Sequence, residues 1–141
     1  GELVVHRTVA THVVEVFRAL FEADFPIEEM RLVTTADHHA KPTGDGNNTA
    51  AYNCRTRVGQ GRWSAHAYGT AVDINPFHNP MVRRGTVVPE HGWAYVDRAR
   101  VRPGMLTADG PAVRAFRAAG WVWGGDWTHS KDWMHFSTDG S

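Results

Sequence analysis

Apolar residues keep a helical spacing in only two segments of this chain, one near each end. In residues 9–21, valine, phenylalanine and leucine recur every three or four positions, which predicts an amphipathic helix with Thr8 as its N-cap. Residues 111–119 predict a shorter helix, with Pro111 in its first turn and Gly120 at its C-terminal end. The segment between them shows no alternation of helix and strand patterns. This arrangement disfavours a parallel sheet built from repeated β–α–β units.

Short β-branched and apolar runs predict the strands. These runs cover residues 30–35, 51–56, 69–74, 121–123 and 134–136. The segment 36–48 indicates a loop, and a polar turn is predicted at 124–131. Residues 76–110 contain most of the prolines, and we expect a long excursion that lines a site or contains short elements of its own. The fold class that follows is α+β, with a small, mainly antiparallel sheet and flanking helices.

Size and composition exclude several classes of protein. A chain of 141 residues fits one domain, which we expect to span residues 1–141 and to be monomeric. The 15 basic and 15 acidic residues give a net charge of zero, which argues against a nucleic-acid-binding protein that works through bulk positive charge. No run approaches the roughly 20 apolar residues of a membrane span. Cys54 is the only cysteine, so an intrachain disulfide is excluded.

His66, Asp73 and His135 could together bind a catalytic metal ion. Two imidazoles and one carboxylate are a common ligand set for zinc, and they leave the fourth position open for water. On one straight strand, residues seven apart point to opposite faces, but Gly69 between His66 and Asp73 permits a turn that aims both inward. The spacing alone is a weak signal, because two hydrogen-bonded core histidines and a loop carboxylate would give the same pattern.

Asp132 and Arg55 are the candidate catalytic residues. Asp132 precedes His135 by three residues, where a carboxylate can lie beside the metal-activated water and act as a general base. Partial burial would raise its pKa toward the working range. Arg55 lies on a predicted strand and could stabilise an oxyanion or bind a substrate carboxylate through two hydrogen bonds. The alternatives are a turn-capping role for Asp132 and a solvated strand charge for Arg55.

Aromatic and hydroxyl side chains near these positions are candidate substrate-binding residues. Trp127 and Trp133 flank the predicted turn and could form part of a cleft for a peptide or a sugar, whereas Trp121 and Trp123 share a face that fits the core. Two further candidates flank His66, namely Ser64 and Tyr68. Ser64 also permits a serine nucleophile, although a supporting hydrogen bond to the site is the alternative.

Several spaced motifs together resemble the M15 zinc peptidases. In chain order they are Asn53-Cys54-Arg55, then Ser64-Ala65-His66 with Asp73 seven residues later, then Gly120 to Trp127, and then Asp132-Trp133-Met134-His135-Phe136. That family includes D-alanyl-D-alanine carboxypeptidases, VanY-like enzymes and phage endolysins that cut the L-alanyl-D-glutamate bond. The Ser-x-His-x6-Asp and Asp-x-x-His-Phe spacings are most similar to the endolysin branch.

The resemblance extends from about Asn47 to Phe136. It implies one Zn²⁺ per chain, with His66, Asp73 and His135 as ligands. It also implies Asp132 as the base and Arg55 as the residue that binds the transition state or the substrate. The fold that it implies is the compact α+β fold that D-Ala-D-Ala peptidases share with the hedgehog signalling domain.

The expected function is therefore hydrolysis of peptide bonds in the stem peptides of bacterial peptidoglycan. The reaction would be of the D-Ala-D-Ala carboxypeptidase or the L-Ala-D-Glu endopeptidase type, and the sequence leaves the choice between these bonds open. We expect the protein at the bacterial cell envelope, secreted, or encoded by a phage as a lysin, although the given sequence shows no signal segment. Two alternatives remain: a hedgehog-like, zinc-stabilised binding module of the envelope without turnover, and a metal-free serine hydrolase that uses Ser64.

Overall fold

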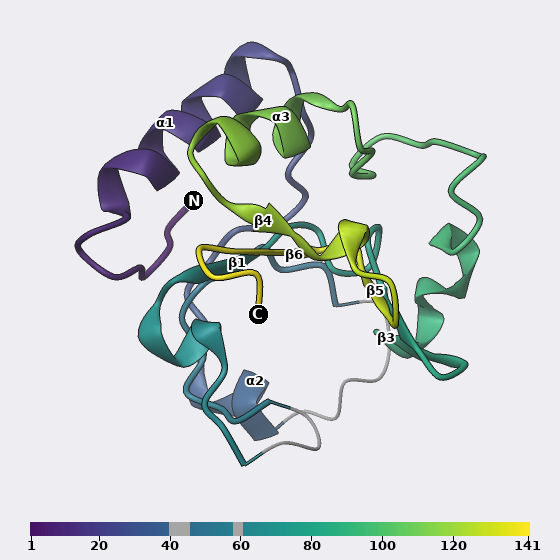
Figure 1. The fold of residues 1–141 in the computed structure, drawn as a ribbon, viewed down its shortest axis with the longest axis horizontal. Helices are drawn as coiled ribbons and strands as arrows, with labels where there is room; N and C mark the ends of the chain where they lie inside the picture. Colours follow the sequence, from purple (N-terminus) through teal and green to yellow (C-terminus); the bar gives the residue numbers. More distant parts are fainter. Residues whose placement is uncertain (40–45, 58–60) are drawn as a thin grey trace.

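The chain folds into helices arranged around two small antiparallel sheets (Figure 1). A computed structural model describes residues 1–39, 46–57 and 61–141. The α-helices are α1 (Ala10–Glu22), α2 (Thr35–His39) and α3 (Pro111–Ala118). The 3₁₀ helices are η1 (Ala65–Tyr68), η2 (Glu90–Tyr95) and η3 (Gly124–Asp126). Within the described part of the chain, no helix has the length and apolar character needed to cross a membrane.

The two sheets each contain three short strands that pair antiparallel. The first sheet has the order β1 (Ala71–Asp73), β6 (His135–Ser137), β4 (Val122–Trp123). The second has the order β3 (Thr86–Val88), β2 (Met81–Arg83), β5 (Lys131–Asp132). The expected α+β class, with small antiparallel sheets and flanking helices, is confirmed.

The strand register places several site candidates side by side. Asp73 on β1 lies directly opposite His135 on β6, so their side chains lie on the same face of the first sheet. Asp132 ends β5 and lies opposite Met81 in the second sheet. Only two residues separate Asp132 from His135, so the chain passes from one sheet to the other within the candidate site.

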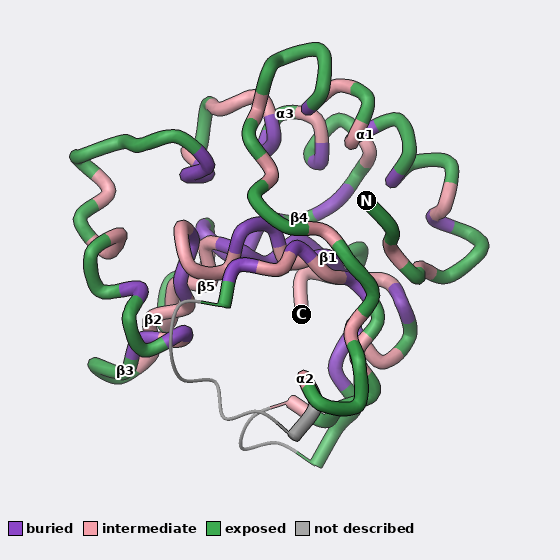
Figure 2. The backbone as a smooth tube through the Cα atoms, turned by 180° about the vertical axis from the view of Figure 1, so that it is seen from behind, coloured by how far each residue is buried: buried purple, intermediate pink, exposed green. Residues whose placement is uncertain are grey.

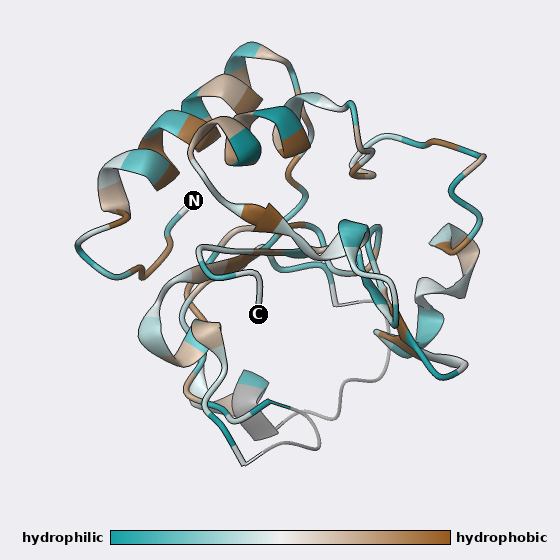
Figure 3. Ribbon diagram, viewed as in Figure 1, coloured by the Kyte–Doolittle hydropathy of each residue, from teal (hydrophilic) through white to brown (hydrophobic). Residues whose placement is uncertain are grey.

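Helices α1 and α3 cover the first sheet and form the core with it. Figure 2 shows the buried positions concentrated on the sheet and on the inner sides of both helices, and Figure 3 shows the hydrophobic β4 beneath them. The ring of Phe116 on α3 stacks on Phe136 of β6 with a centroid distance of 4.0 Å. Both predicted helices are confirmed, and Gly120 has the positive φ of 82° that suits the end of α3. Thr8 is not the N-cap, because α1 begins after Val9.

The strand predicted at residues 30–35 is wrong, because local capping starts a helix there instead. The Thr34 amide donates to Oδ2 of Asp37 at 2.6 Å, and the Asp37 amide donates to Oγ1 of Thr34 at 3.3 Å. This reciprocal arrangement is a capping box, and it starts α2 at Thr35. The backbone of Arg31 is satisfied by the side-chain amide of Asn48 rather than by a neighbouring strand.

The strand predicted at residues 51–56 is also wrong. Ala50 forms an isolated bridge with Asp73, but the next amides pair with other segments. The amide of Tyr52 donates to the carbonyl of Val4 at 3.1 Å, and the amide of Asn53 donates to that of His66 at 3.2 Å. The segment therefore connects the N-terminal residues with the 3₁₀ helix that carries His66, without joining a sheet.

The excursion at residues 76–110 contains β2, β3 and η2, as the prediction of short internal elements requires. The side chain of Arg98 holds several parts of this excursion together. It donates to the carbonyls of His78, Tyr95 and Leu106 and to Oδ1 of Asn79. Burial lowers the pKa of Arg98 to about 10. The guanidinium also lies 4.8 Å from the ring centroid of Trp133, so the excursion is attached to the segment between β5 and β6.

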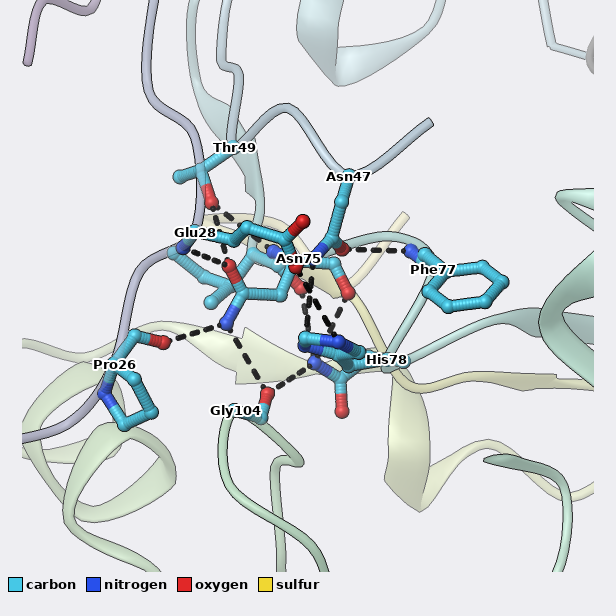
Figure 4. Close-up of polar contacts among 10 residues, drawn as sticks. Pro26, Glu28, Asn47, Thr49, Asn75, Phe77, His78 and Gly104 are labelled. Carbon is cyan, nitrogen blue, oxygen red and sulfur yellow. Dashed lines mark hydrogen bonds and ion pairs between the residues drawn. The ribbon is translucent and has the colours of Figure 1, made fainter. Parts of the chain in front are cut away.

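A buried polar cluster fixes the chain just after β1 (Figure 4). The side-chain amide of Asn75 donates to the carbonyls of Pro26 at 2.8 Å and Gly104 at 3.2 Å. Its Oδ1 accepts the amide of Glu28 at 3.2 Å, and its own amide donates to Thr49 Oγ1 at 3.0 Å. Because Asn75 follows Asp73 by two residues, these bonds from three other segments hold the end of β1 in place.

Candidate active site

His66 is positioned by a single turn of 3₁₀ helix. Ser64 is the N-cap of η1, and its Oγ accepts the His66 amide at 3.3 Å. The turn predicted at Gly69 is present, with a left-handed φ of 67° at the end of η1. A Cβ at this glycine would lie 2.6 Å from the backbone nitrogen of His6, so the position also requires a small residue. The turn lets His66 on η1 and Asp73 on β1 approach each other.

The three ligand candidates converge on one point. Nε2 of His66 lies 3.1 Å from Oδ2 of Asp73 and 3.2 Å from Nδ1 of His135. The same Nδ1 lies 3.0 Å from Oδ1 of Asp73. In a tetrahedral zinc site with bonds of 2.0–2.1 Å, two ligand atoms lie about 3.3 Å apart. The observed spacing therefore fits a zinc shell with three protein ligands.

Backbone carbonyls fix which imidazole nitrogens face inward. Nδ1 of His66 lies 2.6 Å from the carbonyl oxygen of Ala51, and Nε2 of His135 lies 3.1 Å from that of Ser141. A carbonyl only accepts hydrogen bonds, so each outward nitrogen is the protonated donor. The inward nitrogens then present lone pairs to the Asp73 carboxylate, which also offers only lone pairs. Such a cluster needs positive charge at its centre, which a bound metal ion supplies and which a proton supplies in the metal-free protein. Outer hydrogen bonds of this kind are typical of metal-binding histidines.

The electrostatics of the cluster agree with this requirement. Burial acts to raise the pKa of Asp73, but the charges and hydrogen bonds of His66 and His135 outweigh it and lower that pKa well below its usual range. For His135, burial acts to lower the pKa, but the hydrogen bond and charge of Asp73 outweigh burial and raise it. The carboxylate of Asp73 is therefore ionised, and the site favours positive charge beside it.

Asp132 lies beside the cluster in a different environment. Its Oδ1 is buried and has no hydrogen-bond partner among residues 1–39, 46–57 and 61–141. Burial, followed by the charge of Asp73, raises the pKa of Asp132 to about 7, while the charges of His135, His66 and Arg55 act to lower it. A carboxyl group with such a pKa can accept and release a proton near neutral pH.

Gly124 sets the spacing between Asp132 and His135, and the sequence analysis did not identify it. A Cβ on Gly124 would lie 2.6 Å from the carbonyl oxygen of Asp132 and 3.3 Å from Cβ of His135. The neighbouring Gly125 accepts a hydrogen bond from Nζ of Lys131 at 2.9 Å. The signal in the sequence is the glycine pair directly after the buried Trp123, because glycine in such a place marks a close approach of backbones.

The tryptophans divide between the site and the core. The ring of Trp127 lies 5.5 Å from that of His135. It therefore borders the ligand cluster, by which we mean His66, Asp73 and His135. Trp133 instead packs partly against the core and under Arg98. The structure buries Trp121 and Trp123, as the shared core face predicted.

The remaining candidates lie around His66. Ser64 is buried, whereas Tyr68 is 58% exposed. Arg55 is exposed, and its charge acts on Asp132. Both ring nitrogens of His66 already have other partners, and Ser64 bonds its backbone amide instead. This geometry counts against a Ser–His nucleophile.

A protein family described as D-alanyl-D-alanine carboxypeptidase, within the M15 peptidases, matches residues 58–138. The chain belongs to this family. The match covers more than half of the chain and includes His66, Asp73, Asp132 and His135, whereas Arg55 lies just before it. The protein is thus a peptidase, and M15 peptidases are zinc enzymes. The comparisons with curated proteins and with solved structures return no match.

Proposed function

We propose that this M15 peptidase uses one zinc ion to hydrolyse peptide bonds in the stem peptides of bacterial peptidoglycan. The bond is of the D-Ala-D-Ala or the L-Ala-D-Glu type. The enzyme acts at the bacterial cell envelope, as a secreted protein or as a phage lysin. One observation supports the zinc mechanism most strongly. Two imidazole nitrogens and the Asp73 carboxylate lie within 3.2 Å of one another. The other ring nitrogen of each histidine donates its proton to a backbone carbonyl, that of Ala51 or Ser141, so the nitrogens that face inward are free to bind a metal ion.

The residues of the site divide the reaction between them. His66, Asp73 and His135 would hold the zinc ion, which when bound supplies Lewis acidity for the attacking water and the scissile carbonyl. Asp132 takes a proton from the water as its oxygen bonds to the carbonyl carbon. It then gives the proton to the leaving amine as the C–N bond breaks. Arg55 stabilises the negative charge that develops on the substrate.

Zinc analysis and product analysis test this proposal together. We expect about one zinc per chain in the parent protein and almost none in His135→Ala, because removal of one of three protein ligands opens the site. Mass spectrometry of digested muropeptides identifies the bond that is cut. Full activity on muropeptides after exhaustive chelation would refute the zinc mechanism.

Asp132→Asn separates an enzyme from a zinc-stabilised binding module. The amide keeps the shape of the carboxyl group but cannot accept the proton, so we expect the rate to fall about 10²–10⁴-fold while the zinc content stays the same. A binding module would keep its function unchanged in this variant. The buried Oδ1 of Asp132, which has no partner in the described parts of the chain, favours the enzyme, since a purely structural zinc site does not need such a group.

A further inference from the structure

An arm of the chain next to His66 carries three arginines. We call residues 53–57 and 61–64 the arginine arm. Its two sides pair through the Arg57 amide, which donates to the Arg62 carbonyl at 2.9 Å, and the Ser64 amide, which donates to the Arg55 carbonyl at 3.1 Å. An antiparallel bridge joins Thr56 to Trp63 between these bonds. Arg57 therefore lies opposite Arg62, and Arg55 lies opposite Ser64.

This pairing places all three arginines on one face of the arm. Residues directly opposite each other share a face, and so do residues two apart on an extended segment. Arg55, Arg57 and Arg62 therefore share the face of the buried Ser64, while Trp63 lies on the other face and is 53% exposed. Like charges directly opposite each other, as at Arg57 and Arg62, are destabilising unless an anion lies between them.

The protein itself supplies no ion-pair partner for Arg57 or Arg62 in the part that the structure describes, whereas Arg55 lies close enough to Asp132 for its charge to act on that carboxyl group. None of the ion pairs there involves Arg55, Arg57 or Arg62, and residues 46–72 include no aspartate or glutamate. The acids Glu29 and Asp37 are both bound by Arg31, and Asp73 and Asp132 lie at the candidate active site. In addition, Nε of Arg57 is buried and lacks a hydrogen-bond partner in the described segments. A buried donor without a partner is costly, so the Arg57 guanidinium gains from an anion that binds its other nitrogens.

One end of the arm lies at the candidate active site. Ser64 begins the helix that carries His66, the Asn53 amide donates to the His66 carbonyl, and the charge of Arg55 acts on Asp132. Arg57 and Arg62 lie one strand repeat farther out, about 7 Å along the chain from Arg55. The positive face therefore extends from the ligand cluster outward in one direction.

We propose that Arg57 and Arg62 form a second carboxylate subsite, which selects acidic peptides as substrates. This inference rests on the proposed peptidase function and specifies its substrate class. The peptide would have a free carboxylate about 7 Å beyond the group that Arg55 contacts. A peptide is favoured over a phosphate-bearing wall polymer because the arginine face ends at the residues that would act on a peptide bond.

Paired peptides test the subsite. One is an acidic stem peptide, and its partner has the distal carboxylate converted to a carboxamide. The parent should prefer the acid about 10-fold or more in kcat/KM, and Arg57→Gln/Arg62→Gln should lose this preference while it still cleaves the amide. The control Arg7→Gln/Arg18→Gln removes two exposed arginines near and on α1 and should keep the preference. Equal cleavage of acid and amide by the parent would overturn the subsite but leave the peptidase function intact.

Binding measurements on Asp132→Asn separate the subsite from turnover. Calorimetry should show tighter binding of the acid than of the amide, and this difference should disappear when the two arm substitutions are added. That result supports the subsite even if the parent cleaves neither peptide. The substitutions could instead weaken binding of a phosphate-bearing wall polymer and leave the preference for the acid unchanged. In that case the arginine arm binds the polymer and the proposal is wrong.

Discussion

Two aspartates in the same site have pKa values shifted in opposite directions, and their neighbours explain the difference. Asp73 lies within 3.1 Å of one nitrogen of each of two imidazoles, and in the metal-free protein their charges and hydrogen bonds outweigh its burial and keep it ionised. Asp132 has a buried oxygen without a partner among the residues that the structure describes, and it lies near the charge of Asp73, so its pKa rises to about 7. When their environments move the pKa values of two carboxyl groups apart in this way, one group stays ionised and the other can transfer a proton near neutral pH.

Replacement of Asp132 should change how the stability of the metal-free protein depends on pH. The folded-state pKa of about 7 exceeds the ordinary 3.8, so the folded parent must keep a proton that the unfolded chain releases. The parent therefore loses stability as the pH rises from about 4 to 7, at up to about 1.4 kcal/mol per pH unit, and the loss is constant above that range. Asp132→Asn has no such group, so the free energy of unfolding of this variant, relative to that of the parent, should be higher at pH 8 than at pH 5.

Urea unfolding of chelated protein at these two pH values measures the effect. Asp109→Asn is the control, because Asp109 is exposed and distant from the ligand cluster in sequence. A stability difference between Asp132→Asn and the parent that is the same at both pH values would contradict the raised pKa.

The close approach at Gly124 gives a second prediction for a single residue. In Gly124→Ala the new Cβ meets the Asp132 carbonyl at 2.6 Å, so the segment with Asp132 must shift. Because displacements near 1 Å can cost about 10²-fold in rate, we expect kcat to fall by at least 10-fold. Gly46→Ala, where a Cβ meets nothing within 4 Å, should keep the parent rate. Steady-state kinetics on a stem peptide decide the question, and an unchanged kcat in Gly124→Ala would contradict it.

Among the secondary-structure elements, the two longer helices were predictable, whereas α2 and three of the strands were not. Helices α1 and α3 span enough residues for their periodicity to be read. The strands β2, β3 and β5 have two or three residues each, too few for alternation to be visible, and the prediction missed all three. At residues 30–35 the β-branched composition favoured a strand, but the Thr34–Asp37 capping box starts a helix there.

The candidate site was predictable where side chains define it. Residue types suggested the grouping of His66, Asp73 and His135 and the turn at Gly69, and the resemblance to the M15 peptidases implied the grouping, which the structure brings together. The carbonyls of Ala51 and Ser141 could not be predicted, because main-chain acceptors have no sequence signature. The arrangement of the arginine arm likewise depends on a pairing of short segments that only the structure shows.

The cap of η1 gives a prediction at the scale of one element. Ser64→Ala removes the hydroxyl that accepts the His66 amide, which should lower the free energy of unfolding by about 1 kcal/mol. Zinc affinity should also fall a few-fold, because the cap helps to hold His66. Urea unfolding and a competitive zinc titration measure the two effects. Ser64→Thr keeps a capping hydroxyl and should restore both, so failure of this rescue would argue against the cap.

For the whole molecule, the ligand cluster joins distant parts of the chain. His66 lies on η1, Asp73 on β1 and His135 on β6, so a bound ion closes a loop of 69 residues between the two histidines. Around this cluster, α1 and α3 pack on the first sheet, while Arg98 attaches the 76–110 excursion to Trp133. Binding of a metal should therefore stabilise the fold as a unit.

Removal of zinc should lower the thermal stability of the entire protein. A ligand present at 100 times its Kd stabilises the folded state by about 2.7 kcal/mol, which corresponds to roughly 5–10 °C in Tm for a chain of this size. Calorimetric scans with excess zinc and with chelator should show one transition that moves by this amount. His135→Ala should show no zinc-dependent shift. If the parent also shows none, the folded protein does not bind the ion.

The placement of Asp132 and His135 on different sheets has a consequence for how such an enzyme could be altered. The proposed proton acceptor belongs to the β3-β2-β5 sheet, and the proposed metal ligands belong to η1 and the other sheet, with only Trp133 and Met134 between Asp132 and His135. Changes in the β2–β3 hairpin could therefore shift the position of the acceptor without disturbing the metal ligands. Turnover and metal affinity would then be separately adjustable properties, and hairpin exchange between relatives would be a practical route to retune catalysis.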